Sequence, residues 1–259
     1  MAADKLNQAI AAFQAGDKAT AKTLFQEVIS TDPNNDTAWY YFAALQDDPA
    51  RRRAALNKVL EINPDHPEPR KIRRAVDALE AGEIIAYPTD TVYGLGCDLF
   101  NKKAVERLYQ LKGMQRDQKL AFVCADISDA AKYAVMHDQV FRTIKRHLPG
   151  PYVFILEATR EVPKIVHLPR KTIGVRIPNH AVPLALVREL GRPIISSSAA
   201  RHGAEGSPDP HEIDIEFPGL ALVLDAGPGG TAPTSVVDLT GSVPVVVREG
   251  AGDVSAFVD

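Results

Sequence analysis

Apolar side chains recur at helical spacing over the first part of the chain. Leu6, Ile10 and Phe13 follow one another at intervals of three or four residues, and the pattern resumes after Gly16 over residues 21–29. Side chains three or four residues apart lie on the same side of a helix, and a glycine between two such runs favours a turn. The pattern therefore predicts a helical hairpin.

The same pattern returns over residues 39–45 and 56–60, which predicts a second helical hairpin. The pair resembles the tetratricopeptide repeat, an architecture of about 34 residues per copy. The consensus-like positions are Ala21, Phe25, Pro33 and Trp39. The prolines that close the two copies, Pro33 and Pro64, are only thirty-one residues apart, so we expect the first turn of the second copy to be shortened.

Two interpretations of this helical region stay open. It is either a platform that binds a peptide or a second copy of the chain, or an appendage that covers a face of the main domain. Three prolines, Pro64, Pro67 and Pro69, then predict a stiff linker. We therefore expect a TPR-like helical region with its linker over residues 1–69 and a second domain over residues 70–259.

From residue 71 onward, helical periods alternate with short apolar runs that are typical of buried strands. Helices are predicted near residues 76–80, 104–111, 128–135, 139–147 and 182–190. Strands are predicted at residues 84–87, 120–124, 152–156, 173–177, 194–196, 220–224, 235–239 and 243–247. Because strands outnumber the helices that could connect parallel neighbours, we expect an α/β domain with a mixed, partly antiparallel sheet.

Composition narrows the class of protein without identifying its ligands. The 259 residues carry thirty basic and thirty-three acidic side chains, so the net charge of −3 does not indicate nucleic-acid binding, although it is compatible with a local basic patch. Cys97 and Cys124 have no Cys or His cluster beside them, which fits a reduced chain better than a disulfide framework or a zinc site. No apolar run reaches the length of a membrane span. We expect a soluble cytoplasmic protein.

The most informative stretch, residues 88–96, reads Pro-Thr-Asp-Thr-Val-Tyr-Gly-Leu-Gly and directly follows the predicted strand at 84–87. Small polar side chains and glycines at the end of a buried strand present hydroxyl groups and bare amides where α/β proteins build binding sites. The alternative is a turn that satisfies only its own backbone. The remaining polar motifs of the domain decide between the two.

Several polar motifs lie at the ends of predicted elements far apart in the sequence. Lys112 ends a helix, Arg176 lies on a strand, and three serines at 196–198 end another strand. Cations neutralise phosphate or carboxylate, and hydroxyls complete the contacts to their oxygens, so the set suits an anionic ligand such as a nucleotide. No Walker-type phosphate loop is present. Taken singly, Lys112 also fits a solvated helix end, and the serines fit an ordinary strand terminus.

Six polar motifs occur in the order found in YrdC-type proteins. They cover residues 88–96, 148–151, 172–178, 193–199, 207–208 and 234–238. From about residue 71 to its end, the chain resembles this family, whose members include L-threonylcarbamoyladenylate synthases and proteins described as binding double-stranded RNA. Residues 246–254 look most like the YciO branch. The resemblance implies a twisted mixed α/β sheet with a concave, positively charged cleft, here preceded by the small all-α region.

The resemblance also implies a reaction, in which L-threonine, bicarbonate and ATP condense into threonylcarbamoyladenylate and pyrophosphate on the way to a tRNA modification. By position, the implied catalytic residues are Lys112, Arg176 and Ser198, and the implied threonine-binding residues are Thr89, Arg176 and Ser235. The implied nucleotide-binding residues are Lys112, Arg116, Thr172, Ser198, Ser207 and Arg248. The resemblance further implies Mg²⁺ that accompanies ATP, with no organic cofactor and no metal bound by the protein alone.

Three positions depart from the synthase pattern. Met114 stands where the main branch has the arginine of Lys-x-Arg, and Ala200 stands where it has the asparagine of Ser-x-Asn. A lost charge-assisted contact costs a few kcal/mol, or orders of magnitude in rate when it acts on the transition state. Arg116 either reaches the phosphates instead or lies in an exposed loop. Val123 replaces a residue that is polar in many synthases and lies near threonine.

Two hypotheses therefore follow. The first is a YciO-like enzyme that makes threonylcarbamoyladenylate, with reduced activity; the retained Lys112, Arg176 and Ser198 favour it. The second is a non-catalytic protein whose cleft binds nucleotide or double-stranded RNA and whose helical region recruits a partner protein, which Met114 and Ala200 favour. The sequence favours the enzyme modestly.

Overall fold

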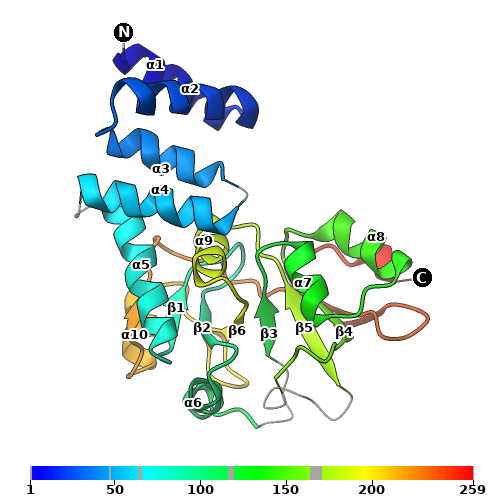
Figure 1. Ribbon diagram of the computed structural model, residues 1–259. Coiled ribbons are helices and arrows are strands. Elements are labelled where there is room, and N and C mark those ends of the chain that lie inside the picture. The colour runs from blue at the N-terminus through cyan, green and yellow to red at the C-terminus, as the bar shows by residue number, and fades with distance from the viewer. Residues whose placement is uncertain (1, 47, 64–65, 116–119, 164–170, 259) are drawn as a thin grey trace. The chain divides into compact units, whose positions relative to one another are not determined.

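The chain divides into two compact units, Met1–Arg74 and Ala75–Asp259, in a computed structural model (Figure 1). The structure describes residues 2–258 apart from 47, 64–65, 116–119 and 164–170. Each unit has its own cluster of buried apolar side chains. Within the described part of the chain, no helix is both long and apolar enough to cross a bilayer.

Two helical hairpins make up most of the first unit, as the periodicity predicts. Their helices are α1 (Ala2–Gln14), α2 (Lys18–Thr31), α3 (Asp36–Ala44) and α4 (Pro49–Ile62). The side chains of Asp17 and Asn35 accept hydrogen bonds from the amides at the start of α2 and α3, which satisfies donors that a helix leaves open. At nine residues α3 is the shortest of the four helices.

Aromatic side chains hold the two hairpins together. The rings of Phe25 and Tyr41 stack at 5.4 Å between centroids, and Phe13 meets the edge of Tyr41 at 5.2 Å. Phe25 is fully buried, and such ring pairs stabilise a core beyond the area that they bury. The resemblance of this unit to tetratricopeptide repeats stays a prediction.

The predicted proline linker is wrong in part. Helix α5 (Pro67–Glu80) begins at Pro67, so Pro67 and Pro69 lie in its first turn. Proline is favoured there because the first amides of a helix have no partner within the helix. Pro64 lies outside the described residues. The border between the two units falls within α5, and Gly82 follows the helix with a φ of +82°.

The second unit contains a nine-stranded mixed sheet among its described residues, which confirms the predicted fold class. The strands are β1 (Ile85–Tyr87), β2 (Gly94–Asp98), β3 (Ala121–Val123), β4 (Tyr152–Glu157), β5 (Thr172–Arg176), β6 (Ile194–Ser198), β7 (Leu222–Val223), β8 (Ser235–Asp238) and β9 (Val245–Arg248). Their order in space is β7-β1-β2-β6-β3-β5-β4-β8-β9. The pairs β1–β7, β3–β5 and β4–β8 are parallel, and the other pairs are antiparallel.

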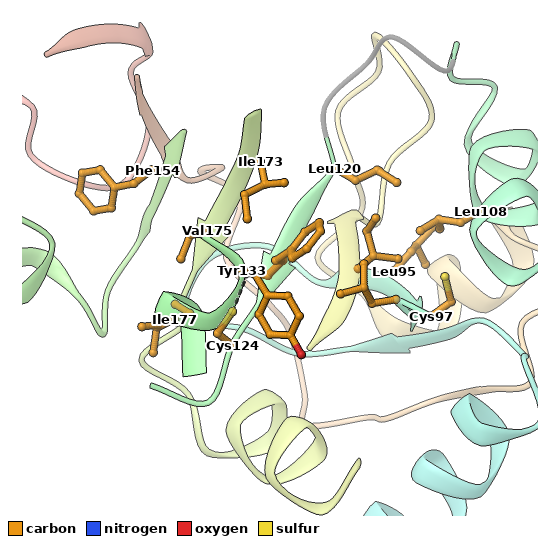
Figure 2. Close-up of a cluster of buried hydrophobic side chains, with 14 of the residues drawn as sticks. Leu95, Cys97, Leu108, Leu120, Cys124, Tyr133, Phe154, Ile173, Val175 and Ile177 are labelled. Carbon is orange, nitrogen blue, oxygen red and sulfur yellow. Dashed lines mark hydrogen bonds between the residues drawn. The ribbon is translucent and has the colours of Figure 1, made fainter. Parts of the chain in front are cut away.

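One face of this sheet carries the main core. The helices of the unit, besides the end of α5, are α6 (Lys102–Lys112), α7 (Ile127–Tyr133), α8 (Asp138–His147), α9 (Ala181–Leu190) and α10 (Pro210–Glu216). Alternate strand residues, among them Leu95, Phe154 and Val175, share one buried cluster with residues of α6, α7, α8 and α10. Figure 2 shows these strand side chains gathered with Leu108 of α6 and Tyr133 of α7. The other alternate residues must therefore face the opposite side of the sheet.

The periodicity missed strand β2 and helix α10. Gly94 and Gly96 made β2 look like a turn, because glycine weakens an isolated strand. A Cβ at Gly96 would lie 2.6 Å from Ile194 and 2.9 Å from the Tyr87 ring, so the neighbouring strands leave no room for a side chain there. Tertiary packing therefore requires the residue type that local propensity disfavours.

The core assignment predicts a large effect at Phe154, which is fully buried in β4. Phe154→Ala should lower the free energy of unfolding by about 3–5 kcal/mol, because it removes a ring and leaves a cavity. Phe141 of α8, 41% exposed, provides the matched control, and Phe141→Ala should cost less than about 1 kcal/mol. Urea denaturation measures both values, and equal losses would contradict the assignment.

Candidate functional site

The face of the sheet opposite the main core is hollowed by small residues. Ser196, Ala121 and Gly174 lie side by side on β6, β3 and β5, because Ala121 pairs in register with both of the others. A Cβ at Gly174 would lie 2.9 Å from the Val153 side chain. These residues line a cavity of about 140 Å³. A row of small side chains across three strands therefore forms its floor.

Arg176, at the end of β5, is the central cation of this cavity. Its Nη2 donates hydrogen bonds to Thr89 Oγ1 at 2.9 Å, to Asp90 Oδ1 at 2.8 Å and to Thr91 Oγ1 at 2.8 Å. The side chains of Arg176 and Asp90 are only 10% and 11% exposed. Arg176 Nε is buried without a partner among the described residues. The guanidinium is thus held rigidly and keeps one donor unsatisfied.

The hydroxyls of the stretch 88–96 serve mainly to hold this arginine. Thr89 Oγ1 donates to the carbonyl of Val92 at 2.7 Å and accepts from Arg176 and from the amide of Thr91 at 3.1 Å. Asp90 Oδ2 accepts from the amide of Asn179 at 3.0 Å. The loop between β1 and β2 is therefore more than a turn that satisfies its own backbone.

Arg248 supplies a second cation from the edge strand β9. Its Nε and Nη2 donate to the carbonyl of Thr234 at 3.1 and 2.8 Å, and Nη2 also donates to Thr234 Oγ1 at 3.0 Å. Although the residue as a whole is exposed, partial burial of the guanidinium and the charge of Arg176 lower its pKa. The described lining includes both arginines and no acidic residue, so the cavity attracts anions.

Lys112 approaches the same site from the end of α6. Its Nζ donates to the carbonyl of Ser198 at 2.5 Å and to Ser198 Oγ at 3.3 Å, and Ser198 lines the cavity. Gly113 ends the helix in the left-handed conformation, at a φ of +66°. Lys112 is 4% exposed, and this burial lowers the pKa of its side chain to about 8. Its charge is therefore sensitive to pH near neutrality.

The structure does not bring every predicted site residue to the cavity lining. Thr172 Oγ1, at the far end of β5 from Arg176, is buried without a partner among the described residues. Ser207 Oγ donates to Glu212 at 2.5 Å. Ser235 is fully buried, and its Oγ donates to the carbonyl of Gly252 at 2.6 Å. Arg116 lies outside the described residues.

The three residues that depart from the synthase pattern are at least partly buried. Met114 Sδ is 3.9 Å from the Oγ of Ser197, which lines the cavity. Ala200 is 6% exposed, and a Cβ built on Gly206 would lie 3.1 Å from its Cβ. Val123 pairs in register with Arg176 across β3 and β5 and is 1% exposed. Met114 thus packs against the main core, and Ala200 and Val123 are buried as well.

Sequence reasoning missed three residues that hold the two arginines of the site, namely Asp90, Thr91 and Thr234. Asp90 and Thr91 lie within the stretch 88–96, but only Thr89 was a candidate, because the sequence does not show which acid meets a buried arginine. A larger cavity of about 240 Å³ lies elsewhere, at residues of α8, β4 and the turn between β8 and β9, and its described lining holds neither lysine nor arginine. The presence of cations, and not size, therefore selects the smaller of these two cavities.

The buried pair predicts a stability effect. Asp90→Asn should lower the free energy of unfolding by about 3 kcal/mol, because Arg176 would remain buried without its carboxylate. Glu83→Gln is the matched control: the ion pair of Glu83 with Arg107 spans 2.7 Å, but both side chains are at least 40% exposed. Such an exposed pair contributes less than about 1 kcal/mol. Thermal and urea denaturation compare the two, and equal small losses would show that Arg176 does not need Asp90.

The chain matches the family described as telomere recombination, Sua5/YciO/YrdC, over residues 77–250. YciO of Escherichia coli strain K12 is 39% identical over 206 residues, which are 78% of this chain and 100% of YciO. Threonylcarbamoyl-AMP synthase of Mus musculus is 34% identical over 181 residues, which are 67% of this chain and 63% of the synthase. The resemblance inferred from the six motifs is confirmed.

Solved structures agree with these matches. The crystal structure of E. coli YciO aligns with a TM-score of 0.71 at 39% identity and covers 73% of this chain and 93% of that chain. The crystal structure of P. abyssi Sua5 complexed with L-threonine aligns with a TM-score of 0.66 at 32% identity and covers 70% of this chain and 54% of that chain. This chain therefore belongs to the Sua5/YciO/YrdC family.

Proposed function

We propose that this chain synthesises L-threonylcarbamoyladenylate from threonine, bicarbonate and ATP, as a step toward threonylcarbamoyladenosine in tRNA, in the cytoplasm. The observation that carries the proposal is the pair of guanidiniums, Arg176 and Arg248, over a floor of small residues with no acid in the described lining. The similarity of this chain to the mouse threonylcarbamoyl-AMP synthase and to Sua5 complexed with L-threonine supports the proposal. The site suits a carboxylate beside a chain of phosphates.

The roles of the residues follow from their positions. In this proposal the guanidinium of Arg176 pairs with the threonine carboxylate, and Thr89 orients the guanidinium. Lys112 and Arg248 offset the charge of the phosphates, and Ser198 donates its hydroxyl to them. We retain Ser235 for threonine, and Arg116, Thr172 and Ser207 for the nucleotide, on the strength of the family resemblance alone.

The proposed chemistry needs positioning and charge neutralisation more than a protein nucleophile. A carbamate oxygen of N-carboxythreonine attacks the α-phosphorus of ATP, the bond to the bridging oxygen breaks, and pyrophosphate leaves with the charge that the cations offset. The described residues contain no group of three or more His, Cys, Asp or Glu side chains that could hold a metal. We therefore propose that Mg²⁺ enters with the phosphates of ATP, which are its main ligands.

A second candidate function is binding without catalysis. Met114, at the position where the main branch has a guanidinium, packs against the main core, and Lys112 Nζ is engaged by Ser198. A cleft with these features would still hold a nucleotide or structured RNA, while charge on the departing pyrophosphate would be offset less well. Saturable binding of ATP without threonine-dependent pyrophosphate release would favour this alternative.

Activity tests the proposal directly. The chain, incubated with ATP, Mg²⁺, threonine and bicarbonate, should release pyrophosphate only when both threonine and bicarbonate are present, with the adenylate detected by mass spectrometry. Arg176→Gln should lower this rate at least a hundredfold, because a charge-assisted contact to the carboxylate is lost. Arg192→Gln is the control, since Arg192 pairs with Asp98 and does not line the cavity. Pyrophosphate release at the same rate with and without threonine would contradict the proposal.

The lowered pKa of Lys112 predicts how ATP binding depends on pH. A lysine loses its positive charge as the pH rises through its pKa, which burial lowers to about 8 here. The dissociation constant for ATP should therefore rise about tenfold between pH 7 and pH 9, by proton linkage. The Lys112→Gln variant should bind ATP more weakly at pH 7, and its dissociation constant should not rise between pH 7 and pH 9.

The control for this prediction is Lys103→Gln, on an exposed residue of the same helix. Its pH dependence should match that of the unaltered chain. Calorimetry measures the affinities at each pH. A slope that persists in folded Lys112→Gln would assign the titration to another group.

A further inference from the structure

Basic side chains are concentrated at the end of the first unit. Residues 51–74 hold eight of the thirty lysines and arginines of the chain but only three of its thirty-three acids. Six of the eight are arginines. Elsewhere in the chain the acids outnumber the bases, so the net charge of −3 conceals a basic segment. This segment precedes residue 77, where the family match begins.

Helix α4 and the first half of α5 present this charge to solvent. We define the α4/α5 basic surface by its described side chains, namely Arg51, Lys58, Arg70, Lys71, Arg73 and Arg74. Arg51 and Lys58 are 78% and 42% exposed, and the four cations of α5 are exposed as well. Each helix has fourteen residues and is about 21 Å long, so the surface spans several phosphate spacings of a nucleic acid.

A hydrogen bond connects the two basic helices. Arg73 Nη1 of α5 donates to Asn57 Oδ1 of α4 at 2.9 Å, which links the two helices next to Lys58 within the first unit. Arg51 lies 3.6 Å from Asp48, and Lys58 lies 2.9 Å from Glu61. Ion pairs as exposed as these contribute little, so a polyanion can replace them at small cost.

The surface lacks the apolar anchors that other partners need. The large apolar side chains that are exposed among the described residues all belong to the second unit. A membrane surface or a protein hot spot uses such side chains together with charge. Arginine-rich, apolar-poor surfaces instead suit phosphate, which a guanidinium binds through two parallel hydrogen bonds.

We propose that the α4/α5 basic surface binds the phosphate backbone of a structured RNA. The binding follows from charge and exposure, whereas the choice of RNA over DNA rests on the proposed function, whose product serves tRNA modification. The contacts read no base sequence, so affinity depends on salt and tolerates changes in sequence. The surface shares no residue with the cavity lining, so RNA binding here needs no group of the proposed active site.

Fluorescence anisotropy tests this proposal. A labelled RNA hairpin of about 20 base pairs is titrated with the full chain at several KCl concentrations between about 50 and 200 mM. The triple variant Arg51→Gln, Arg70→Gln, Arg74→Gln should bind at least tenfold more weakly, and its salt slope should be shallower by about three. The matched control removes three exposed lysines of the second unit, Lys102→Gln, Lys103→Gln and Lys132→Gln. It should bind like the unaltered chain.

Equal weakening in both triple variants, or no binding by the unaltered chain, would overturn the proposal. Equal affinity for a DNA duplex of the same length would overturn the choice of RNA, and binding to vesicles with anionic lipid but not to the hairpin would assign the surface to membranes. The double variant Lys58→Gln, Lys71→Gln repeats the test if the triple variant does not fold. Pyrophosphate release by the triple variant reports separately on the proposed function.

Discussion

The site is organised by the contacts of one buried guanidinium. Arg176 joins β5 to the loop after β1 through Thr89, Asp90 and Thr91, which all accept from the same nitrogen. A buried arginine is tolerated only when a carboxylate and further acceptors replace its water. Because these acceptors occupy Nη2, a ligand meets the remaining nitrogens in a fixed orientation, and binding costs little additional ordering of the side chain.

The shape of the cavity follows from the same alternation that builds the core. Along each strand, one set of residues packs the main core and the other set faces the opposite side. Where Ser196, Ala121 and Gly174 align across three strands, the second set is too small to fill its side of the sheet. Arg176 and Arg248 lie at this gap, so the sheet supplies both the space and the charge for an anion.

The two units present cations in different ways. In the second unit, Lys112 is buried, and burial lowers its pKa because the charged form loses hydration. Such a charge suits a single enclosed binding site. In the first unit, the cations of α4 and α5 are exposed, which costs little and suits a long, hydrated polyanion. The units thus fit two different ligand classes.

The sequence determined most helices, eight of the nine strands that the described residues form, and the family, because these depend on local period and on short motifs that keep their order. Only the tertiary structure decided which polar groups meet. Gly96 became part of a strand through its neighbours Tyr87 and Ile194, and Asp90 became the partner of Arg176. Ser235, a candidate by motif, turned its hydroxyl to Gly252 instead of the cavity. The direction of a side chain depends on cross-strand register and burial, which link residues that are distant in sequence.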